Sequence, residues 1–305
     1  MTLKIFHSKN VFGDIGDGSV NSIYHCINAY SKKCELINFF THFGDEKPDI
    51  YYFYKEEYLT RDILTKLKQA SPSTKFVMIY WDQRGSIPSI IQERKGLLDA
   101  LLINNEEVAQ VKMYKQFGIP HVFTFHHGVP VDEFRDFDTP VTHDVFFGGN
   151  NFNHNKFPLS KFRYDLIMRI RKYNSIVVYG MGWPFPTEKR VPRHVYARVL
   201  RSAKVNLGTN HYDITRYYDR RLFECMGSGR AHITRYVPGM EKHFENGKHL
   251  VWFHSIPQAI NAVTNLLRYP EKREMIAAAG RKLVFEQHSF DVRSQQLKEI
   301  FANLC

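Results

Sequence analysis

The sequence predicts an α/β protein made of two halves, each with a parallel sheet and crossover helices. Strand-like and helix-like segments alternate along the chain, and the whole pattern occurs twice. The stretch Val129–Pro140 lies between the two halves, is rich in proline and acidic residues and has no clear period. With 305 residues, the chain is long enough for two domains of ordinary size.

The first half is predicted to be a series of strands joined by helices. Its strands are expected at Leu3–His7, Cys34–Phe40, Ile50–Tyr54, Lys75–Trp81, Ala100–Asn104 and His121–Phe125. Its helices are expected at Val20–Tyr30, Tyr58–Ala70 and Glu106–Phe117, the last of which ends at Gly118. We take residues 1–140 as the first domain.

The second half repeats the pattern. Its strands are expected at Asp144–Phe147, Ser175–Tyr179, Lys204–Gly208, Ala231–Thr234 and Leu250–Phe253. Its helices are expected at Ser160–Tyr173, Arg193–Ala203, around Glu224, at Pro257–Arg268 and from about Glu271 to the end, with a break near His288. We take residues 141–287 as the second domain and 288–305 as a helix that packs back on the first. Ligands of open parallel sheets bind beyond the carboxyl ends of the strands, so residues there are the site candidates.

Composition excludes several classes of protein. Hydrophobic residues make up 43% and charged residues 24%, as in globular proteins. No apolar run approaches the roughly 20 residues that span a bilayer, and no signal peptide is apparent, so we expect a cytoplasmic protein. The four cysteines and scattered histidines show no metal-binding spacing, so we expect no metal.

The formal net charge is +11, which favours a polyanionic partner. Sugar-nucleotide phosphates are the smallest such partner, and nucleic acid or an anionic membrane the largest. A solvated basic surface is the alternative, because no lysine run or DNA-binding motif is present.

The segment Arg220–Arg230 carries the strongest signal. It places Glu224 in a short helix that ends at glycine, just before the strand Ala231–Thr234. A carboxylate at this point can accept two hydrogen bonds from a ribose diol. The alternative is a surface glutamate near a helix N-terminus, where the dipole favours it.

Four motifs resemble a known family. They are Arg221-Leu222-Phe223-Glu224 with Gly227-Ser228-Gly229, Phe146-Phe147-Gly148-Gly149 with Arg163, Asn246–Val251, and Ala279-Gly280-Arg281 with His288-Ser289-Phe290 and Arg293. Together they resemble the C-terminal, donor-binding domain of GT-B glycosyltransferases, in particular the spore-coat-maturation branch of the retaining family that includes sucrose and glycogen synthases. The resemblance covers about residues 144–300.

The resemblance implies a GT-B fold, with two Rossmann-like domains facing each other across a cleft. It implies transfer of a sugar from a nucleotide diphosphate sugar, most simply a UDP-sugar, to a hydroxyl acceptor. The second domain would hold the donor and the first the acceptor. Retention of configuration without a metal or other cofactor is implied as well.

The donor-binding candidates are of three kinds. Gly148 and Gly149 would let a phosphate approach the backbone, unless they form an ordinary turn. Arg163, Arg220 and Arg221 could pair with the diphosphate, and at most one of the last two serves, because they point in different directions. Ion pairs or a solvated helix face are the alternatives.

A second group of donor candidates is less direct. Gly180 and Gly182 with Trp183 would form the pocket for the base, or a turn with a packed tryptophan. Many relatives carry a glutamate eight residues before the one matched by Glu224, but this chain has Arg216 there. A basic residue at this position could bind the diphosphate instead.

The catalytic candidates come from the first half. Asp17, in the loop Gly13–Ser19, could orient an acceptor hydroxyl, as could Asp14, although Asp-Gly is common in turns. Asp82 follows a strand and could act as a base or bind a sugar hydroxyl. His127, like His126, ends a strand.

Next to Asp82, Tyr80 or Trp81 could stack on a sugar or a flipped base, unless it packs in the core.

The acceptor remains open between two classes. One is a hydroxymethylated pyrimidine in DNA, which suits the basic charge and the aromatic first half. The other is an envelope, spore-coat or small-molecule acceptor. Two rival functions are a non-catalytic nucleic-acid-binding protein on a decayed transferase fold, suggested by Arg216, and a sugar-nucleotide epimerase or hydrolase.

Overall fold

The structure of the protein is a computed structural model, which describes residues 3–8, 25–30, 44–55, 59–82, 85–135, 138–152, 156–189, 191 and 193–305. By its internal contacts the chain divides into two compact units, and each contains one parallel sheet. The first unit comprises residues 1–128 and 290–305, and the second comprises residues 129–289.

The first unit contains a six-stranded parallel sheet with the order β2-β1-β3-β4-β5-β6. Its strands are β1 (Lys4–Ser8), β2 (His25–Tyr30), β3 (Ile50–Phe53), β4 (Lys75–Tyr80), β5 (Ala100–Ile103) and β6 (His121–Thr124). Its helices are α3 (Arg61–Ala70), α4 (Ser89–Gln92), α5 (Val108–Phe117) and α11 (Phe290–Ala302).

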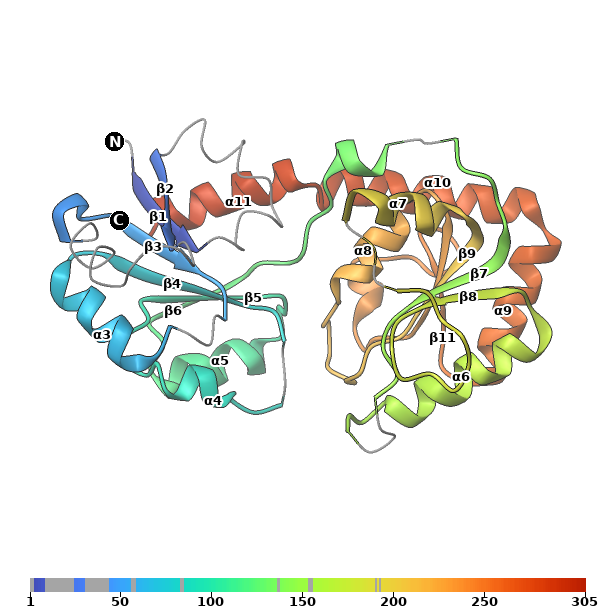
Figure 1. Cartoon of the computed structure of the whole chain (residues 1–305), viewed down its shortest axis with the longest axis horizontal. Coiled ribbons are helices and arrows are strands. Elements are labelled where there is room, and N and C mark those ends of the chain that lie inside the picture. The colour runs from blue at the N-terminus through green and yellow to red at the C-terminus, as the bar shows by residue number, and fades with distance from the viewer. Residues whose placement is uncertain are drawn as a thin grey trace. The chain divides into compact units, whose positions relative to one another are not determined.

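Helices lie on both faces of this sheet (Figure 1). An apolar layer fills the space between the sheet and the helices on each face. On one face, Leu297, Ile300 and Phe301 of α11 pack against inward-facing strand residues such as Ile79. On the other face, α3, α4 and α5 supply Leu64, Leu67, Ile91 and Tyr114. Alternate strand residues therefore enter opposite layers, as the pleat requires.

The second unit contains a five-stranded parallel sheet with the order β11-β10-β9-β7-β8. Its strands are β7 (His143–Gly148), β8 (Ile176–Tyr179), β9 (Ala203–Gly208), β10 (Ala231–Arg235) and β11 (Val251–Phe253). Its helices are α6 (Ser160–Tyr173), α7 (Arg193–Arg201), α8 (Arg220–Gly227), α9 (Ile256–Arg268) and α10 (Pro270–Gln287), with short 3-10 turns η2 (Val131–Phe134) and η3 (Met240–Lys242).

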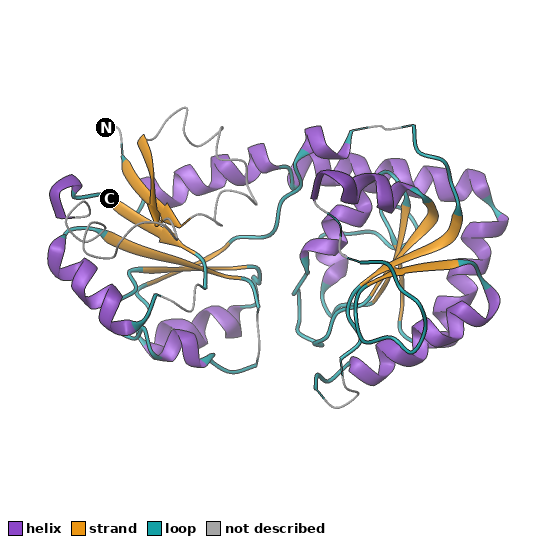
Figure 2. Cartoon of the chain, viewed as in Figure 1, coloured by secondary structure: helices purple, strands orange, loops and turns teal. Residues whose placement is uncertain are grey.

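Helices cover both faces of this sheet (Figure 2). Phe146 of β7 packs with residues of α7 and α8, whereas Val145 and Phe147 pack with residues of α6 and α9. In chain order, the first and third strands of the unit, β7 and β9, are neighbours, and the chain leaves them in opposite directions. Their carboxyl ends form the switch point at which open α/β sheets bind ligands.

One predicted element is wrong. The helix expected over Val20–Tyr30 is a strand where it is described, because His25–Tyr30 pairs in parallel with β1 at the sheet edge. Pairing with the sheet overrides the local helical pattern. The strand expected at Cys34–Phe40 lies outside the described residues.

The expected domain limits differ from the contact-based ones at the first crossing. Residues 1–140, 141–287 and 288–305 were the predicted bounds, with Val129–Pro140 as a linker. In the structure, Val129 and Phe134 are fully buried in the core of the second unit. Val129 also donates its backbone N–H to the carbonyl oxygen of His288 (2.9 Å). The predicted linker therefore packs with the second unit, beginning at its first residue, Val129.

Candidate functional site

A cavity of about 500 Å³ opens at the switch point of the second unit. The loop after β7, the loop after β8 and the helices α6, α7 and α8 contribute its walls. Among the described residues it is lined by Gly148, Gly149, Asn150, Phe152, Arg163, Tyr179, Gly180, Val191, Tyr196, His211, Arg220, Arg221 and Glu224. Five of the seven predicted donor-binding residues are in this set: Gly148, Gly149, Arg163, Arg221 and Glu224.

The glycine pair after β7 leaves no room for side chains. A Cβ atom at Gly148 would lie 2.8 Å from the hydroxyl oxygen of Tyr196, and one at Gly149 would lie 2.6 Å from Nη1 of Arg221. Both are closer than normal contact. Because both residues are glycine, the side chains of Tyr196 and Arg221 can pack directly against the backbone of this turn. A ligand could approach the same backbone closely.

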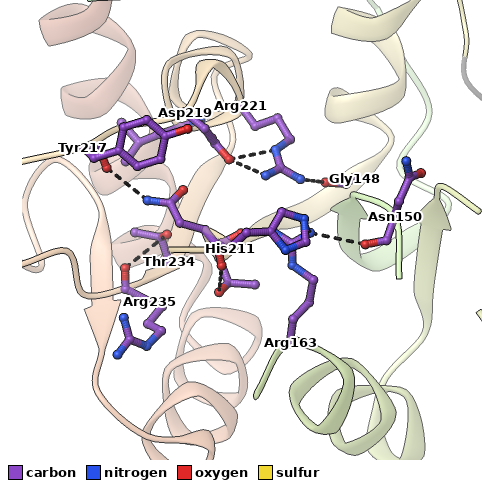
Figure 3. A network of polar contacts seen from close by, with 12 residues as sticks. Gly148, Asn150, Arg163, His211, Tyr217, Asp219, Arg221, Thr234 and Arg235 are labelled. Atoms are coloured by element: carbon purple, nitrogen blue, oxygen red, sulfur yellow. Dashed lines mark hydrogen bonds and ion pairs between the residues drawn. The ribbon is translucent and has the colours of Figure 1, made fainter. Parts of the chain in front are cut away.

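Arg163 lies in the first turn of α6 and is only 1% exposed. Its Nη1 donates to the carbonyl oxygen of Asn150 (3.3 Å) and to Nε2 of His211 (2.5 Å), and its Nη2 donates to the carbonyl oxygen of Thr209 (2.6 Å) (Figure 3). No carboxylate of the described residues is within ion-pair distance of this guanidinium. Arg163 is therefore a buried cation with no ion-pair partner among the described residues, although the charge of Asp219 favours its protonated form.

Burial makes the charged form of Arg163 unfavourable. Burial, and after it the neighbouring charge of Arg221, lower the pKa of Arg163 well below its ordinary value. Arginine nevertheless stays protonated in proteins, so the cost is borne as free energy. An anion bound beside it would offset that cost.

Arg221 is held firmly by α8's own cap. Asp219 is the N-cap residue of α8 and accepts from the backbone N–H of Leu222 (3.2 Å). Its other oxygen accepts from Nε of Arg221 (3.0 Å) and from Nη2 of the same side chain, while Nη1 donates to the carbonyl oxygen of Gly148 (2.5 Å) (Figure 3). Burial alone would raise the pKa of Asp219, but Arg221 lowers it, so the carboxylate stays charged.

Glu224 lies one turn further along α8 and is 1% exposed. Its Oε1 is 3.1 Å from Nε of Arg220, whose side chain is 37% exposed. Both predicted arginines of α8 thus line the cavity. Arg221 contacts Asp219 and the turn after β7, whereas Arg220 contacts Glu224.

Two predicted donor-binding residues do not line the cavity. Gly182 has a φ of +80°, and a Cβ atom there would lie 2.3 Å from the carbonyl oxygen of Asn151. It shapes the loop after β8. Arg216 has a φ of +54°, donates its backbone N–H to the carbonyl oxygen of Pro238 (2.8 Å) and packs its side chain against Gly239.

Trp183 belongs to the core of the second unit. It is 9% exposed, its Nε1 donates to the carbonyl oxygen of Gly149 (2.9 Å), and its ring packs edge-on against Phe147. Of the two predicted roles, the packed tryptophan describes this geometry. Gly180, in the same loop, does line the cavity.

The catalytic candidates all belong to the first unit. Asp17 and Asp14 lie outside the described residues. Asp82 follows β4 and forms an ion pair with Lys55. His127 is 8% exposed and its ring centroid is 4.1 Å from that of Trp81.

The aromatic residues beside Asp82 are buried. Tyr80 and Trp81 are 3% and 5% exposed and pack in the two apolar layers of the first sheet. Core packing, rather than stacking on a ligand, accounts for both rings.

Sequence reasoning missed His211 and Tyr196 as cavity residues. His211 stands in the loop after β9 and belongs to no recognisable motif. Its position at the end of the predicted strand Lys204–Gly208 was the only available signal.

In the described parts of the chain, no cluster of three or more His, Cys, Asp or Glu side chains is arranged to hold a metal ion. No helix there has both the length and the apolar character needed to cross a membrane.

Comparisons with known proteins agree with this geometry. Residues 163–299 match the family described as glycosyl transferase-like. Sucrose-phosphate synthase from Thermosynechococcus elongatus is 11% identical and superposes with a TM-score of 0.66 over 100% of this chain and 99% of its own. HepE from Anabaena, solved with UDP-glucose, is 10% identical with a TM-score of 0.67, over 99% of this chain and 100% of its own.

A third solved structure matches over a smaller share of its own chain. The pneumococcal O-GlcNAc transferase GtfA, solved with UDP and GlcNAc, is 12% identical with a TM-score of 0.60, over 88% of this chain and 60% of its own. No curated protein sequence matches significantly. The chain has the GT-B fold of these structures, and its residues 163–299 resemble the glycosyl transferase-like family. The predicted fold class is thereby confirmed, while the spore-coat branch stays a prediction.

Proposed function

We propose that the protein is a glycosyltransferase whose donor is a nucleoside diphosphate sugar bound in the cavity of the second unit. The observation that carries the proposal is the buried Arg163, a cation with only neutral partners, next to a glycine turn and Arg221. A diphosphate supplies the missing negative charge, and the N-terminus of α6 adds to the attraction.

Other residues of the same cavity would bind the rest of the donor. The diphosphate would lie against Gly148 and Gly149, within reach of Arg163 and Arg221, and the ribose hydroxyls would donate to Glu224. The complexes of HepE with UDP-glucose and of GtfA with UDP and GlcNAc support uridine as the base. A UDP-sugar is therefore the proposed donor.

The proposed chemistry breaks the bond between the anomeric carbon and the diphosphate oxygen and forms one to the acceptor oxygen, with retention. The acceptor proton passes to the leaving phosphate, so no strong protein base is needed. Fixed cations stabilise the charge that develops on the diphosphate, which is the role a metal plays elsewhere. Asp17, Asp82 and His127 remain the proposed acceptor-side residues.

Two acceptor classes remain in the proposal. A hydroxymethylated pyrimidine in DNA is supported by the net charge of +11. An envelope, spore-coat or small-molecule hydroxyl is the alternative acceptor. The rival without catalysis, a nucleic-acid-binding protein, would leave the donor cavity unused.

The test is a thermal-shift and calorimetric panel with UDP, GDP, ADP and their sugar conjugates, with and without EDTA. We expect stabilisation by the UDP series that survives EDTA, by about 2.7 kcal/mol when the ligand concentration is 100 times its Kd. Uridine is the control for binding without phosphates. No stabilisation by any diphosphate would overturn the donor site and favour the non-catalytic rival.

A turnover assay then separates the enzyme classes. We expect release of UDP from the UDP-sugar to depend on an added acceptor. Equal turnover without any acceptor would instead indicate an epimerase or hydrolase.

A further inference from the structure

The three acceptors around Arg163 share one property: none carries a charge. Two are the backbone carbonyls of Asn150 and Thr209, and the third is the ring of His211. A guanidinium has five N–H donors, so these three bonds leave two, one of them the buried Nε, which has no acceptor among the described residues. The fork is thus fixed in place by neutral acceptors, while Asp219, which raises the pKa of Arg163, forms its ion pair with Arg221 instead.

The contact with Arg163 also defines the state of His211. Arginine can only donate, so Nε2 of His211 must accept, and the proton of the neutral ring must be on Nδ1. Burial, followed by the positive charges of Arg163 and Arg221, lowers the pKa of His211 to about 3, and Lys156 acts in the same direction while Asp219 opposes it. The ring therefore stays neutral at physiological pH.

Aromatic packing holds the ring in this orientation. The centroid of His211 is 4.7 Å from that of Phe157 and 5.2 Å from that of Phe152, a residue of the cavity wall. The imidazole can therefore act as a rigid support for the arginine rather than as a mobile surface group.

We propose that His211 is a positioning residue that holds Arg163 through a neutral acceptor, so that the group that positions Arg163 does not cancel its charge, and this charge selects diphosphate ligands over monophosphates and nucleosides. This inference rests on the proposed donor site and adds a determinant of its ligand class. A carboxylate in place of His211 would hold the arginine equally well but would form an ion pair and cancel its charge. A neutral ring avoids that loss.

Four proteins test the inference by calorimetry: the wild type, His211→Ala, His211→Gln and His211→Glu, each titrated with UDP, UMP and uridine. The affinity for UDP should fall about ten-fold in His211→Ala, which corresponds to about 1.4 kcal/mol. It should stay near the wild-type value in His211→Gln, because the amide oxygen accepts without a charge, and fall furthest in His211→Glu. The affinity for uridine should not change.

His254→Ala is the matched control, because His254 is an exposed histidine of the same unit and does not line the cavity. It should leave all three affinities unchanged. Circular dichroism and thermal unfolding establish that each variant is folded, and His211→Gln keeps the comparison valid if the alanine variant does not fold. An unchanged ratio of UDP to uridine affinity in His211→Glu would overturn the inference.

A pH series adds a second readout. The UDP affinities of the wild type and of His211→Gln should change in parallel between pH 5 and 8, because neither side chain titrates there. Divergence of the two curves near pH 6.5 would show a titrating His211 and overturn the assigned tautomer. If the wild type binds none of UDP, GDP or ADP, the donor site itself fails, and the inference with it; if it binds UDP and the variants match it, only the inference fails.

Discussion

Glu224 combines near-complete burial with a carboxylate on the wall of the donor cavity. Arg220 reaches it from one turn earlier in α8, and Arg220 is itself more than a third exposed. Burying this carboxylate costs free energy, which the ion pair with Arg220 offsets in part. Glu224 therefore lies where a ligand in the cavity could reach it, and its ribose role stays a prediction.

We expect Glu224→Ala to weaken UDP binding by about ten-fold or more, because two hydrogen bonds to a charged acceptor are lost. Calorimetry with UDP measures the change. Glu286→Ala is the control, since Glu286 is an exposed glutamate of α10 in the same unit. A folded Glu224→Ala protein with wild-type UDP affinity would reject the ribose role.

Among the residues around Arg163, the sequence predicted the charged members of the cavity but not His211. Arg163, Arg221 and Glu224 stand in recognisable motifs beside strand ends or in a helix before glycine. His211 has no such setting, and only its contact with Arg163 reveals it. A neutral acceptor leaves no pattern in a sequence, because its role depends on what lies opposite.

The turns after β7 and β8 show how elements of the second unit are matched to each other. Gly149 lies against the side chain of Arg221, whereas Gly180 lies against the backbone of Gly149 itself. The contact at Gly149 involves a side chain of the cavity. The contact at Gly180 involves the backbone and holds the loop after β8 against the loop after β7. The same substitution should therefore have different consequences at the two positions.

We expect Gly149→Ala to displace Arg221 and lower UDP affinity, with little effect on the free energy of unfolding. A Cβ atom at Gly180 would lie 2.3 Å from a backbone oxygen, and its φ of +151° suits glycine. Gly180→Ala should therefore lower the free energy of unfolding by roughly 2 kcal/mol. Denaturant unfolding and calorimetry separate the two effects.

Gly85→Ala is the control for both variants, because no atom lies within 4 Å of the added Cβ. Equal loss of stability at Gly149 and Gly180 would contradict the distinction between a side-chain and a backbone contact.

At the scale of elements, most strands of the described residues agree with their predicted positions. The alternation of apolar segments is sufficient to locate strands of parallel sheets. The exception is β2, where a short apolar segment fits a helix as well as a strand. Pairing with β1 decided the outcome, and that contact is not encoded locally.

At the scale of the whole molecule, the net charge of +11 exceeds what a single diphosphate requires. This figure already counts every Asp and Glu, so ion pairs such as Lys55–Asp82 and Lys204–Asp144 do not reduce it. This excess is the reason to test the proposed DNA acceptor.

We expect the protein to bind duplex DNA at low salt, with an affinity that falls by an order of magnitude or more between about 50 and 200 mM salt. Filter binding or anisotropy measures the affinity. Transfer from a UDP-sugar to hydroxymethylated DNA, with unmodified DNA as the control, tests the acceptor. Failure to bind duplex DNA at low salt would leave the envelope or small-molecule class.

The sequence by itself determined the α/β class, the two parallel-sheet halves and the motifs that carry Gly148, Gly149, Arg163, Arg221 and Glu224. These follow from periodicity and from residues near strand ends or helix caps, which are local properties of the chain. Only the three-dimensional packing shows that Val129 and Phe134 belong to the second core, that Trp183 is packed, and that Arg163 contacts His211 with no ion-pair partner among the described residues. Such contacts join residues far apart in the chain, and the free energy of burial that selects them has no local signature.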